Sequence, residues 1–155
     1  MKVELLENID LTLLQRLVEL EKEAFDVGGL NEWNLLPFIR HGRVYVAKEQ
    51  QQAVGLIQYM KDWENPRKAY IIGISIAKEM RGQGLGTILL HTSLQELKKE
   101  HIEEIELTVD PENLAAIKVY EEKLGFVRNG FRLDEYGEGE NRLVMVLLLI
   151  NLKEN

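Results

Sequence analysis

The sequence predicts an α/β fold built on one mixed sheet with helices on both faces. Helical and strand-like hydrophobic patterns alternate along the chain. The segment 69–77, "AYIIGISIA", is apolar on both faces of a strand, which predicts a central place in the sheet. The first and last segments have the pattern of antiparallel strands. We therefore expect a mostly antiparallel sheet of six to seven strands, about four flanking helices and a single domain over residues 1–155.

The first sixty residues are expected to form three strands and two helices. The first helix begins after Asp10, a good N-cap, and ends at the glycines of 26–29. The two later strands are joined by the polar "QQQ" at 50–52, which predicts an antiparallel hairpin. The expected elements are strand 2–6, helices 11–25 and 31–42, and strands 43–49 and 53–60.

The second half contains the parallel part of the sheet. Loop 62–68 leads to the central strand, and Leu90, Leu94 and Leu97 then mark the apolar stripe of a helix of about four turns. A strand at 102–109 follows, so strand, helix and strand form a right-handed crossover between parallel neighbours. The remaining elements are helix 113–124 with its stop at Gly125, strand 126–133, loop 134–142 and strand 143–150.

Composition excludes several classes of protein. The chain has no cysteine, which excludes disulfides, thiolate nucleophiles and cysteine-ligated zinc, and its three histidines lack the spacing of a metal site. The net charge of -7 argues against a nucleic-acid partner. The longest apolar run, 143–150, is much shorter than the ~20 residues that cross a bilayer. No secretory signal is visible, so we expect no membrane partner and a cytoplasmic protein.

The stretch "RGQGLG", residues 81–86, breaks the usual pattern at the start of a helix. Helices open with Ser, Thr, Asp or Asn because their first N–H groups favour negative charge, but here Arg81 precedes Gly82, Gly84 and Gly86. Unpaired N–H groups at such a junction form a nest that binds phosphate. The positive charge of Arg81, unfavourable beside an empty helix start, is favourable beside a bound phosphate. The alternative is a tight turn that leaves Arg81 in solvent.

Two other phosphate-binding motifs fit this stretch poorly. The P-loop requires Lys and then Ser or Thr after its last glycine, but Gly86 is followed by Thr87 and Ile88. The dinucleotide fingerprint places GxGxxG directly after the strand, whereas GxGxG here follows the longer approach "AKEM". A phosphate nest of another kind is therefore predicted.

The chain resembles the GNAT superfamily of N-acetyltransferases. Arg81, Gly84 and Gly86 match its Q/R-x-x-G-x-G/A signature between the fourth strand and its helix. The segment 107–126, "LTVDPENLAAIKVYEEKLGF", looks like its second acetyl-CoA motif, with an Asn, a Tyr seven residues later and a closing Leu-Gly-Phe. The element order agrees as well, so the resemblance covers nearly the whole chain.

The resemblance implies a site for acetyl-CoA, with CoA as the product. Asn113 would lie near the pantetheine, Tyr120 near the thioester sulfur and Lys123 near the phosphates. The pantetheine arm would pair with backbone amides of Ile74, Ser75 and Ile76. The pyrophosphate would be held by Arg81, Gly82, Gln83, Gly84, Leu85, Gly86 and Thr87.

Helix geometry offers an independent argument for the second motif. At about 100° per residue, Asn113 and Tyr120 share one helix face within about 20° and lie roughly 10 Å apart. Both can therefore face one extended ligand. The alternative makes Tyr120 an aromatic at the edge of the core with its hydroxyl in water.

The implied reaction is direct attack of a primary amine on the thioester in a ternary complex. It needs a base for the ammonium proton, an N–H donor for the thioester oxygen and an acid for the departing sulfur. The Ile76 amide is a candidate donor. Tyr120 is the expected catalytic acid, because a phenol with a reference pKa of about 10 can protonate a thiolate.

The base is not identified by the sequence. Relatives place a carboxylate on the fourth or fifth strand, where this chain has Ile72, Gly73 and Thr108. Segments that border the acceptor site in the family contain four other acids, Asp26, Glu32, Asp62 and Glu64, and three aromatic residues, Trp33, Trp63 and Tyr136.

Three functions remain open at this point. The first is an acetyl-CoA-dependent N-acetyltransferase for a small-molecule amine or a peptide N-terminus. The second is a CoA-binding regulatory module without turnover, which the missing carboxylate favours, and the third is a nucleotide-binding α/β protein. The acidic balance suits a cationic acceptor or serves solubility alone, and relatives often form homodimers.

Overall fold

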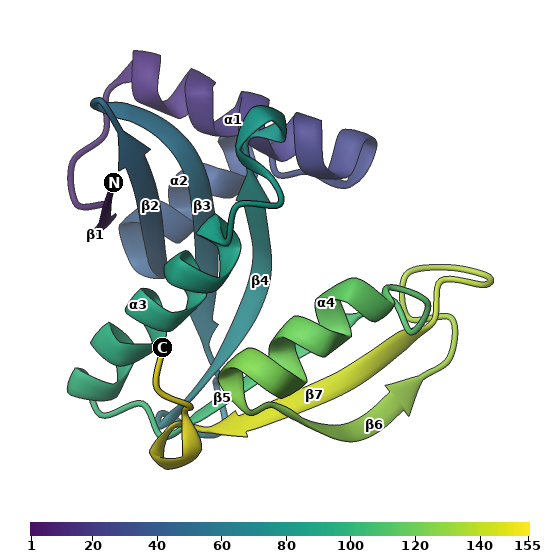
Figure 1. The fold of residues 1–155 in the computed structure, drawn as a ribbon. Coiled ribbons are helices and arrows are strands. Elements are labelled where there is room, and N and C mark those ends of the chain that lie inside the picture. Colours follow the sequence, from purple (N-terminus) through teal and green to yellow (C-terminus); the bar gives the residue numbers. More distant parts are fainter. The chain divides into compact units, whose positions relative to one another are not determined.

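The computed structural model describes residues 1–155 and orders seven strands as β1-β2-β3-β4-β5-β7-β6 (Figure 1). The strands are β1 (Lys2–Leu5), β2 (Arg43–Glu49), β3 (Gln52–Lys61), β4 (Lys68–Ile76), β5 (Glu104–Val109), β6 (Val127–Arg132) and β7 (Arg142–Leu148). The α-helices are α1 (Leu11–Phe25), α2 (Glu32–His41), α3 (Leu85–Lys99) and α4 (Leu114–Lys118). The predicted mixed sheet with four helices is confirmed.

The chain divides into two compact units, and strand β4 runs from one into the other. The first unit comprises residues 1–60 and 72–96, and the second comprises residues 61–71 and 97–155. The single domain expected from the sequence stays a prediction.

The first unit is an antiparallel sheet with helices on both faces. Strands β1, β2 and β3 pair antiparallel, and the pairing of β2 with β3 confirms the predicted hairpin. A Cβ built on Gly55 of β3 would contact Ile76 and Leu89, so this face lies against α3. A Cβ on Gly73 of β4 would contact Gln58 and Phe25, so the other face lies against α1. Alternate residues at the end of β4 therefore face opposite helices.

The second unit contains the parallel pair. β4 and β5 pair in parallel at Lys68↔Glu104, Ala69↔Ile105 and Tyr70↔Glu106, which confirms the predicted crossover. β7 pairs antiparallel with both β5 and β6. Its core residues include Ile105, Leu107, Leu124, Phe126 and Met145.

The predicted helix 113–124 has the expected extent but not one regular geometry. It is α-helical only over α4 and continues as the π-helix η3 (Val119–Leu124). It ends at Gly125, whose φ of 98° is the left-handed conformation that a glycine stop supplies. Three short 3₁₀ segments complete the chain, η1 (Asp26–Gly28), η2 (Lys78–Met80) and η4 (Leu149–Asn151), the last of which shortens the predicted final strand.

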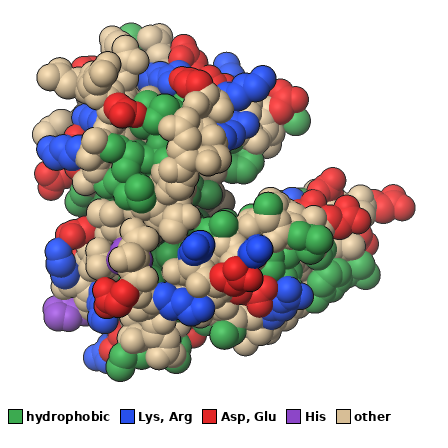
Figure 2. Space-filling model, in the orientation of Figure 1, with side chains coloured by type: hydrophobic (Ala, Val, Ile, Leu, Met, Phe, Trp, Pro, Cys, Tyr) green, Lys and Arg blue, Asp and Glu red, His purple; other side chains and the backbone are tan.

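Charged side chains of both signs are interspersed over the surface in view (Figure 2). No helix combines the length and the apolar character needed to cross a membrane.

Candidate functional site

The loop between β4 and α3 has the backbone that its glycines predicted. After η2, Gly82 has φ 76° and Gly84 has φ 81°, a region that costs other residues about 1 to 2 kcal/mol. A Cβ at either position would meet no atom within 4 Å, so open space lies beside the backbone. Gly86 differs, because its φ is not positive and a Cβ there would make an ordinary contact of 3.9 Å with Ile76. Two of the three glycines are thus required by conformation.

The N–H groups after this loop open helix α3. The first turn of an α-helix has no intrahelical acceptors for its N–H groups, and the macrodipole makes them attractive to an anion. α3 has no acidic residue in its first turn, so no carboxylate of that turn competes with a bound anion for these N–H groups. Residues 81–84 are exposed and lead into this helix start, whose N–H groups suit a phosphate group.

The Arg81 side chain is held by the protein. Its Nε donates to the Ile76 carbonyl at 3.0 Å, and its Nη2 donates to the Glu23 carbonyl at 3.3 Å. The guanidinium therefore ties the end of β4 to the end of α1, a pair of contacts that the sequence did not predict, and the side chain remains exposed. Arg81 fixes the strand from which the loop departs.

Beside the predicted Ser75, the first unit contains a buried polar cluster that the sequence reasoning missed. Glu21 of α1, Gln58 of β3 and Ser75 of β4 are 2%, 0% and 0% exposed. Glu21 Oε1 accepts from Gln58 Nε2 at 2.5 Å and from Ser75 Oγ at 2.9 Å, and its Oε2 accepts from the Leu30 N–H at 3.1 Å. The available signal was a lone Gln and a lone Ser within otherwise apolar strands.

The second unit positions the residues of the second motif. Asn113 is the N-cap of α4, and its Oδ1 accepts from the Ala116 N–H at 3.2 Å. The α-helical repeat ends at Lys118, so the 100° rotation that predicted a shared face for Asn113 and Tyr120 does not continue to Tyr120. Lys123 is exposed in the same π-helix.

Tyr120 has an environment that keeps its phenol protonated. Its ring packs against Phe126, with ring centroids 5.7 Å apart. Burial raises the pKa of Tyr120 above the usual value for a tyrosine, because the phenolate would lose its solvation. A neutral phenol is the form that a proton donor requires.

The two usual carboxylate seats hold no acid. Ile72 and Gly73 are partly exposed on β4. Thr108 of β5 pairs with Tyr70, with 2.9 Å between the hydroxyl oxygens. Burial and a hydrogen bond to Tyr136 raise the pKa of Tyr70 to about 12, against the opposing effect of Thr108.

Two of the four acids proposed near the acceptor lie in each unit. Asp26 follows α1 and Glu32 begins α2 in the first unit, whereas Asp62 and Glu64 belong to the second unit. Asp62 Oδ1 accepts from the Glu64 and Asn65 N–H groups at 2.8 and 2.9 Å, which is a role in turn structure. Trp33 and Trp63 are largely exposed, and Arg142 lies 5.1 Å from the ring centroid of Tyr136.

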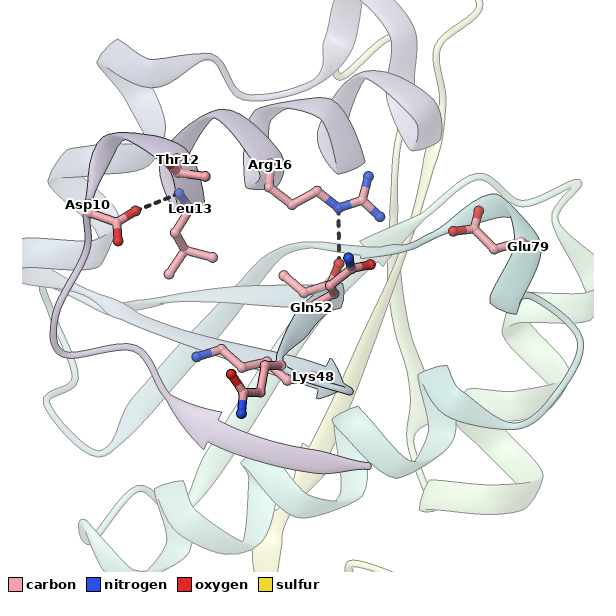
Figure 3. Close-up of a pocket in the computed structure, with 9 residues that line it drawn as sticks. Asp10, Thr12, Leu13, Arg16, Lys48, Gln52 and Glu79 are labelled. Atoms are coloured by element: carbon pink, nitrogen blue, oxygen red, sulfur yellow. Dashed lines mark hydrogen bonds between the residues drawn. The ribbon is translucent and has the colours of Figure 1, made fainter.

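A cavity of about 650 Å³ lies in the first unit, between the start of α1 and the β2–β3 hairpin (Figure 3). Arg16 points from α1 toward the hairpin and donates through Nε to the Ala53 carbonyl at 3.1 Å. Lys48, which also lines the cavity, is paired with Glu4 at 2.8 Å. The cavity contains none of the predicted cofactor residues, and both of its cations already have partners. No cluster of three or more potential metal ligands occurs in the chain.

Comparisons with known proteins identify similar chains. The profile of the family described as "Acetyltransferase (GNAT) family" matches residues 9–126. An N-alpha-acetyltransferase of Saccharolobus solfataricus is 31% identical over 123 residues, which cover 70% of this chain and 73% of that protein. N-alpha-acetyltransferase 30 of Schizosaccharomyces pombe is 35% identical over 86 residues, and the match covers 54% of this chain and only 57% of that protein.

A solved structure has a similar fold. An aminoglycoside 6'-N-acetyltransferase complexed with coenzyme A matches with a TM-score of 0.81 and 15% identity, over 99% of this chain and 100% of that one. At this identity the likeness concerns the fold.

Proposed function

The chain belongs to the acetyltransferase (GNAT) family, and from this premise we propose that it transfers the acetyl group of acetyl-CoA to a primary amine. Similar proteins named N-alpha-acetyltransferase favour the α-amino group of a peptide as the acceptor. The complex of a similarly folded protein with coenzyme A supports the choice of acetyl donor.

The observation that carries this proposal is the start of α3. Gly82 and Gly84 adopt left-handed conformations beside open space, and the helix behind them has 15 residues and no acid in its first turn. This arrangement fits a diphosphate, whose oxygens can accept from several N–H groups at once. The pyrophosphate of CoA is a ligand of this kind, and residues 81–87 would hold it.

Other residues of the chain would serve the reaction. Acetyl-CoA supplies an acetyl group activated as a thioester. The Ile76 N–H would donate to the carbonyl oxygen of that group, from a strand end fixed by the bond between Arg81 and the Ile76 carbonyl. As the neutral amine forms its bond to carbon and the carbon–sulfur bond breaks, Tyr120 would give its phenolic proton to the sulfur. The proton that the nitrogen loses would pass to water, and the phenolate would regain a proton from water.

The test exchanges Gly84 for alanine and compares it with the same change at Gly139. Gly84 and Gly139 have φ values of 81° and 79°, and neither Cβ would meet an atom within 4 Å. Both variants therefore carry the same backbone strain without a clash. Only Gly84→Ala puts a methyl group beside the proposed pyrophosphate nest, so we expect it to weaken acetyl-CoA binding roughly tenfold, or about 1.4 kcal/mol.

Isothermal titration with acetyl-CoA measures both variants. Gly139→Ala should bind as the parent protein does. Equal affinities for the two variants, with both folded by circular dichroism, would remove the phosphate nest from the proposal. Release of free CoA thiol with a panel of peptides bearing free N-termini, and with polyamines, tests the transfer itself.

A CoA-binding module without turnover is the second candidate. It is favoured by the absence of an acid at Ile72, Gly73 and Thr108, and by the engagement of the Thr108 hydroxyl with Tyr70. Tight acetyl-CoA binding with no thiol release across the panel would support this candidate over the enzyme.

A further inference from the structure

One buried polar atom of the first unit has no hydrogen-bond partner. It is Oε1 of Gln58, whose side chain is completely buried on β3. A buried acceptor without a donor costs free energy comparable to a lost hydrogen bond, and such atoms are rare in folded proteins. Gln58 Oε1 therefore needs a donor that comes from outside the chain.

Glu21 prevents Gln58 from satisfying this oxygen by rotating its amide. Gln58 Nε2 donates to Glu21 Oε1 at 2.5 Å, and a rotated amide would place two oxygen atoms against each other. Glu21 is fixed in turn by Ser75 and by the Leu30 N–H. The carboxylate thus determines which end of the Gln58 amide is left unpaired.

The unpaired oxygen borders the space above Gly73. A Cβ at Gly73 would lie 3.3 Å from Gln58 Oε1 and 3.6 Å from Cε2 and Cζ of Phe25. Because Gly73 has no side chain and a Cβ would fit there only tightly, the room at this point on the α1 face of β4 is about that of one methyl or ammonium group. Gly73 is partly exposed and Phe25 is 42% exposed, so solvent reaches both residues, whereas Gln58 Oε1 behind them is buried and is reached only by a group that enters between them.

The chain turns sharply directly after Phe25. Asp26 has φ 52° and ψ -119°, a conformation that costs a residue other than glycine about 1 to 3 kcal/mol. Its N–H still caps α1 through the Lys22 carbonyl, so the turn is held by the helix. The Phe25 ring therefore lies beside Gly73 at the end of a helix whose following residue, Asp26, has an unfavourable backbone conformation.

We propose that Gln58 Oε1, oriented by Glu21, binds an N–H of the acceptor's ammonium group above Gly73, with Phe25 as the adjoining wall. This inference rests on the proposed function and names the amine-binding point of that reaction. Gln58 is a binding residue in this scheme, and Glu21 is a positioning residue.

The chemistry of the space selects a cationic donor. Its polar lining is a carbonyl oxygen backed by a carboxylate, and the three groups that donate to that carboxylate are neutral. An anion would be repelled, whereas an ammonium supplies up to three N–H donors and compensates the buried negative charge. The Phe25 ring is also compatible with a cation nearby.

The first experiment observes the Gln58 side-chain amide by ¹⁵N NMR, with its signal identified by its absence in Gln58→Leu. The probe is methylammonium chloride, and tetramethylammonium chloride is the control because it has the same charge and no N–H. We expect a saturable shift with methylammonium alone. Equal shifts with the two salts, or none with either, would show that the oxygen holds only water, and the proposal would be wrong.

Variants test the same point in the transfer reaction. Gly73→Ala fills the space, and Gln58→Leu removes the oxygen, so each should raise the KM for the peptide acceptor roughly tenfold. The double variant should be no worse than the poorer single variant, since both remove one contact. Tyr59→Phe is the matched control: it removes a buried hydroxyl, 2.7 Å from Ser93 Oγ, from the next residue of β3 and should leave this KM unchanged.

Glu21→Gln tests the positioning role. A glutamine at this position no longer accepts from all three donors, so the Gln58 amide loses its fixed orientation. We expect the Gln58 NMR signal to lose its response to methylammonium while acetyl-CoA affinity stays within about twofold. An unchanged methylammonium response in a folded Glu21→Gln protein would refute this role.

The outcome separates this proposal from the proposed function. Failure of acetyl-CoA to bind the parent protein would defeat the transferase function, while the methylammonium titration would still decide the amine site. Normal acetyl-CoA binding and turnover, with the KM for the acceptor unaffected by Gly73→Ala and Gln58→Leu, would defeat the amine site alone.

Discussion

In the loop 81–86, backbone conformation and hydrogen bonding explain which residue type stands at each position. Gly82 and Gly84 are required by their φ values, whereas Gly86 has the ordinary backbone of a helix. Arg81, in contrast, is placed by two backbone carbonyls. The same loop therefore contains residues selected for conformation and a residue selected for hydrogen bonding.

Tyr120 offers a prediction at this scale. Tyr120→Phe should keep acetyl-CoA affinity and lower kcat roughly 100-fold, because it removes only the proposed proton donor. The raised pKa of Tyr120 keeps the phenol protonated as the pH rises, so the parent enzyme should show no loss of the acid up to its ordinary value of about 10.

Thiol release measured from pH 7 to pH 10, with acetyl-CoA titrations of both proteins, checks this expectation. A kcat for Tyr120→Phe above half of the parent value would exclude Tyr120 as the acid. A fall in the parent rate well below pH 10, absent from the variant, would contradict the direction of the pKa shift.

Sequence reasoning identified the glycine loop because the conformational freedom of glycine is a local property. It missed the cluster of Glu21, Gln58 and Ser75, because three separate segments must first be folded before their side chains meet. Hydrophobic pattern placed each residue on its element but did not show that Gln58 and Ser75 both face Glu21 of α1. The hydrogen bond from Gln58 to Glu21 decides that the Gln58 oxygen is the atom without a partner.

At the scale of elements, helix starts were the most predictable feature. Asp10 accepts from the Leu13 N–H at 2.8 Å, as its sequence position predicted. The transition from α4 to a π-helix was not predictable, since the hydrophobic pattern of 113–124 fits a regular helix. A π-helical turn depends on packing around it, which local propensity does not contain.

The cap of α1 carries the second prediction. Asp10→Ala should lower the free energy of unfolding by about 1 kcal/mol, because the Leu13 N–H loses its acceptor. Urea denaturation monitored by circular dichroism measures this loss. Thr12→Ala, an exposed change in the same turn, is the control and should cost less than about 0.5 kcal/mol. Equal losses in the two variants would show that the cap does not stabilise the helix.

The attachment of β1 to β2 carries the third prediction. Lys2 and Lys48 are directly opposed in the register, and Glu4 lies 2.6 Å and 2.8 Å from their Nζ atoms. Hydrogen bonds from Lys2 and Lys48 lower the pKa of Glu4 from 4.5 to about 2. Since the folded pKa lies below the unfolded one, this stabilisation is complete above about pH 4.5 and is lost as the pH falls toward 2.

Denaturation midpoints at pH 6, 5, 4 and 3 test this dependence. Glu4→Gln should be less stable than the parent protein at pH 6, because two lysines then face each other without a carboxylate. The difference should shrink steadily below pH 4.5. A constant difference across the series would contradict the lowered pKa.

For the whole molecule, the family, the mixed sheet and its parallel crossover followed from the sequence, whereas the position of β7 between β5 and β6 and the acceptor did not. Two motifs, residues 81–86 and 107–126, identified the fold. They lie at the two ends of the crossover that joins β4 to β5, and their separation along the chain is therefore set by the length of that crossover. A binding site for an amine has no comparable motif of fixed spacing in the sequence. Its binding point depends on tertiary contacts of individual polar atoms.

Ligand binding provides the fourth prediction, at the scale of the whole molecule. Acetyl-CoA at about 100 times its Kd should stabilise the protein by roughly 2.7 kcal/mol, or about 5 to 10 °C in Tm. Differential scanning fluorimetry measures the shift, and Gly84→Ala should need a higher concentration to reach it. NAD and ATP at the same concentration are the controls. A larger shift with either nucleotide would favour a nucleotide-binding protein.

The terminal strand β6 has a consequence for behaviour in concentrated solution. All six of its residues are exposed at the end of the sheet order, so another chain has an edge to which it can add. Arg128 and Arg132, paired with Glu121 and Glu106, place charge along this edge, and the register skips Asn129. The same strand thus combines a risk of aggregation with the charges and the irregular register that oppose it. Neutral replacements of Arg128 and Arg132 would therefore shorten the shelf life of a concentrated sample.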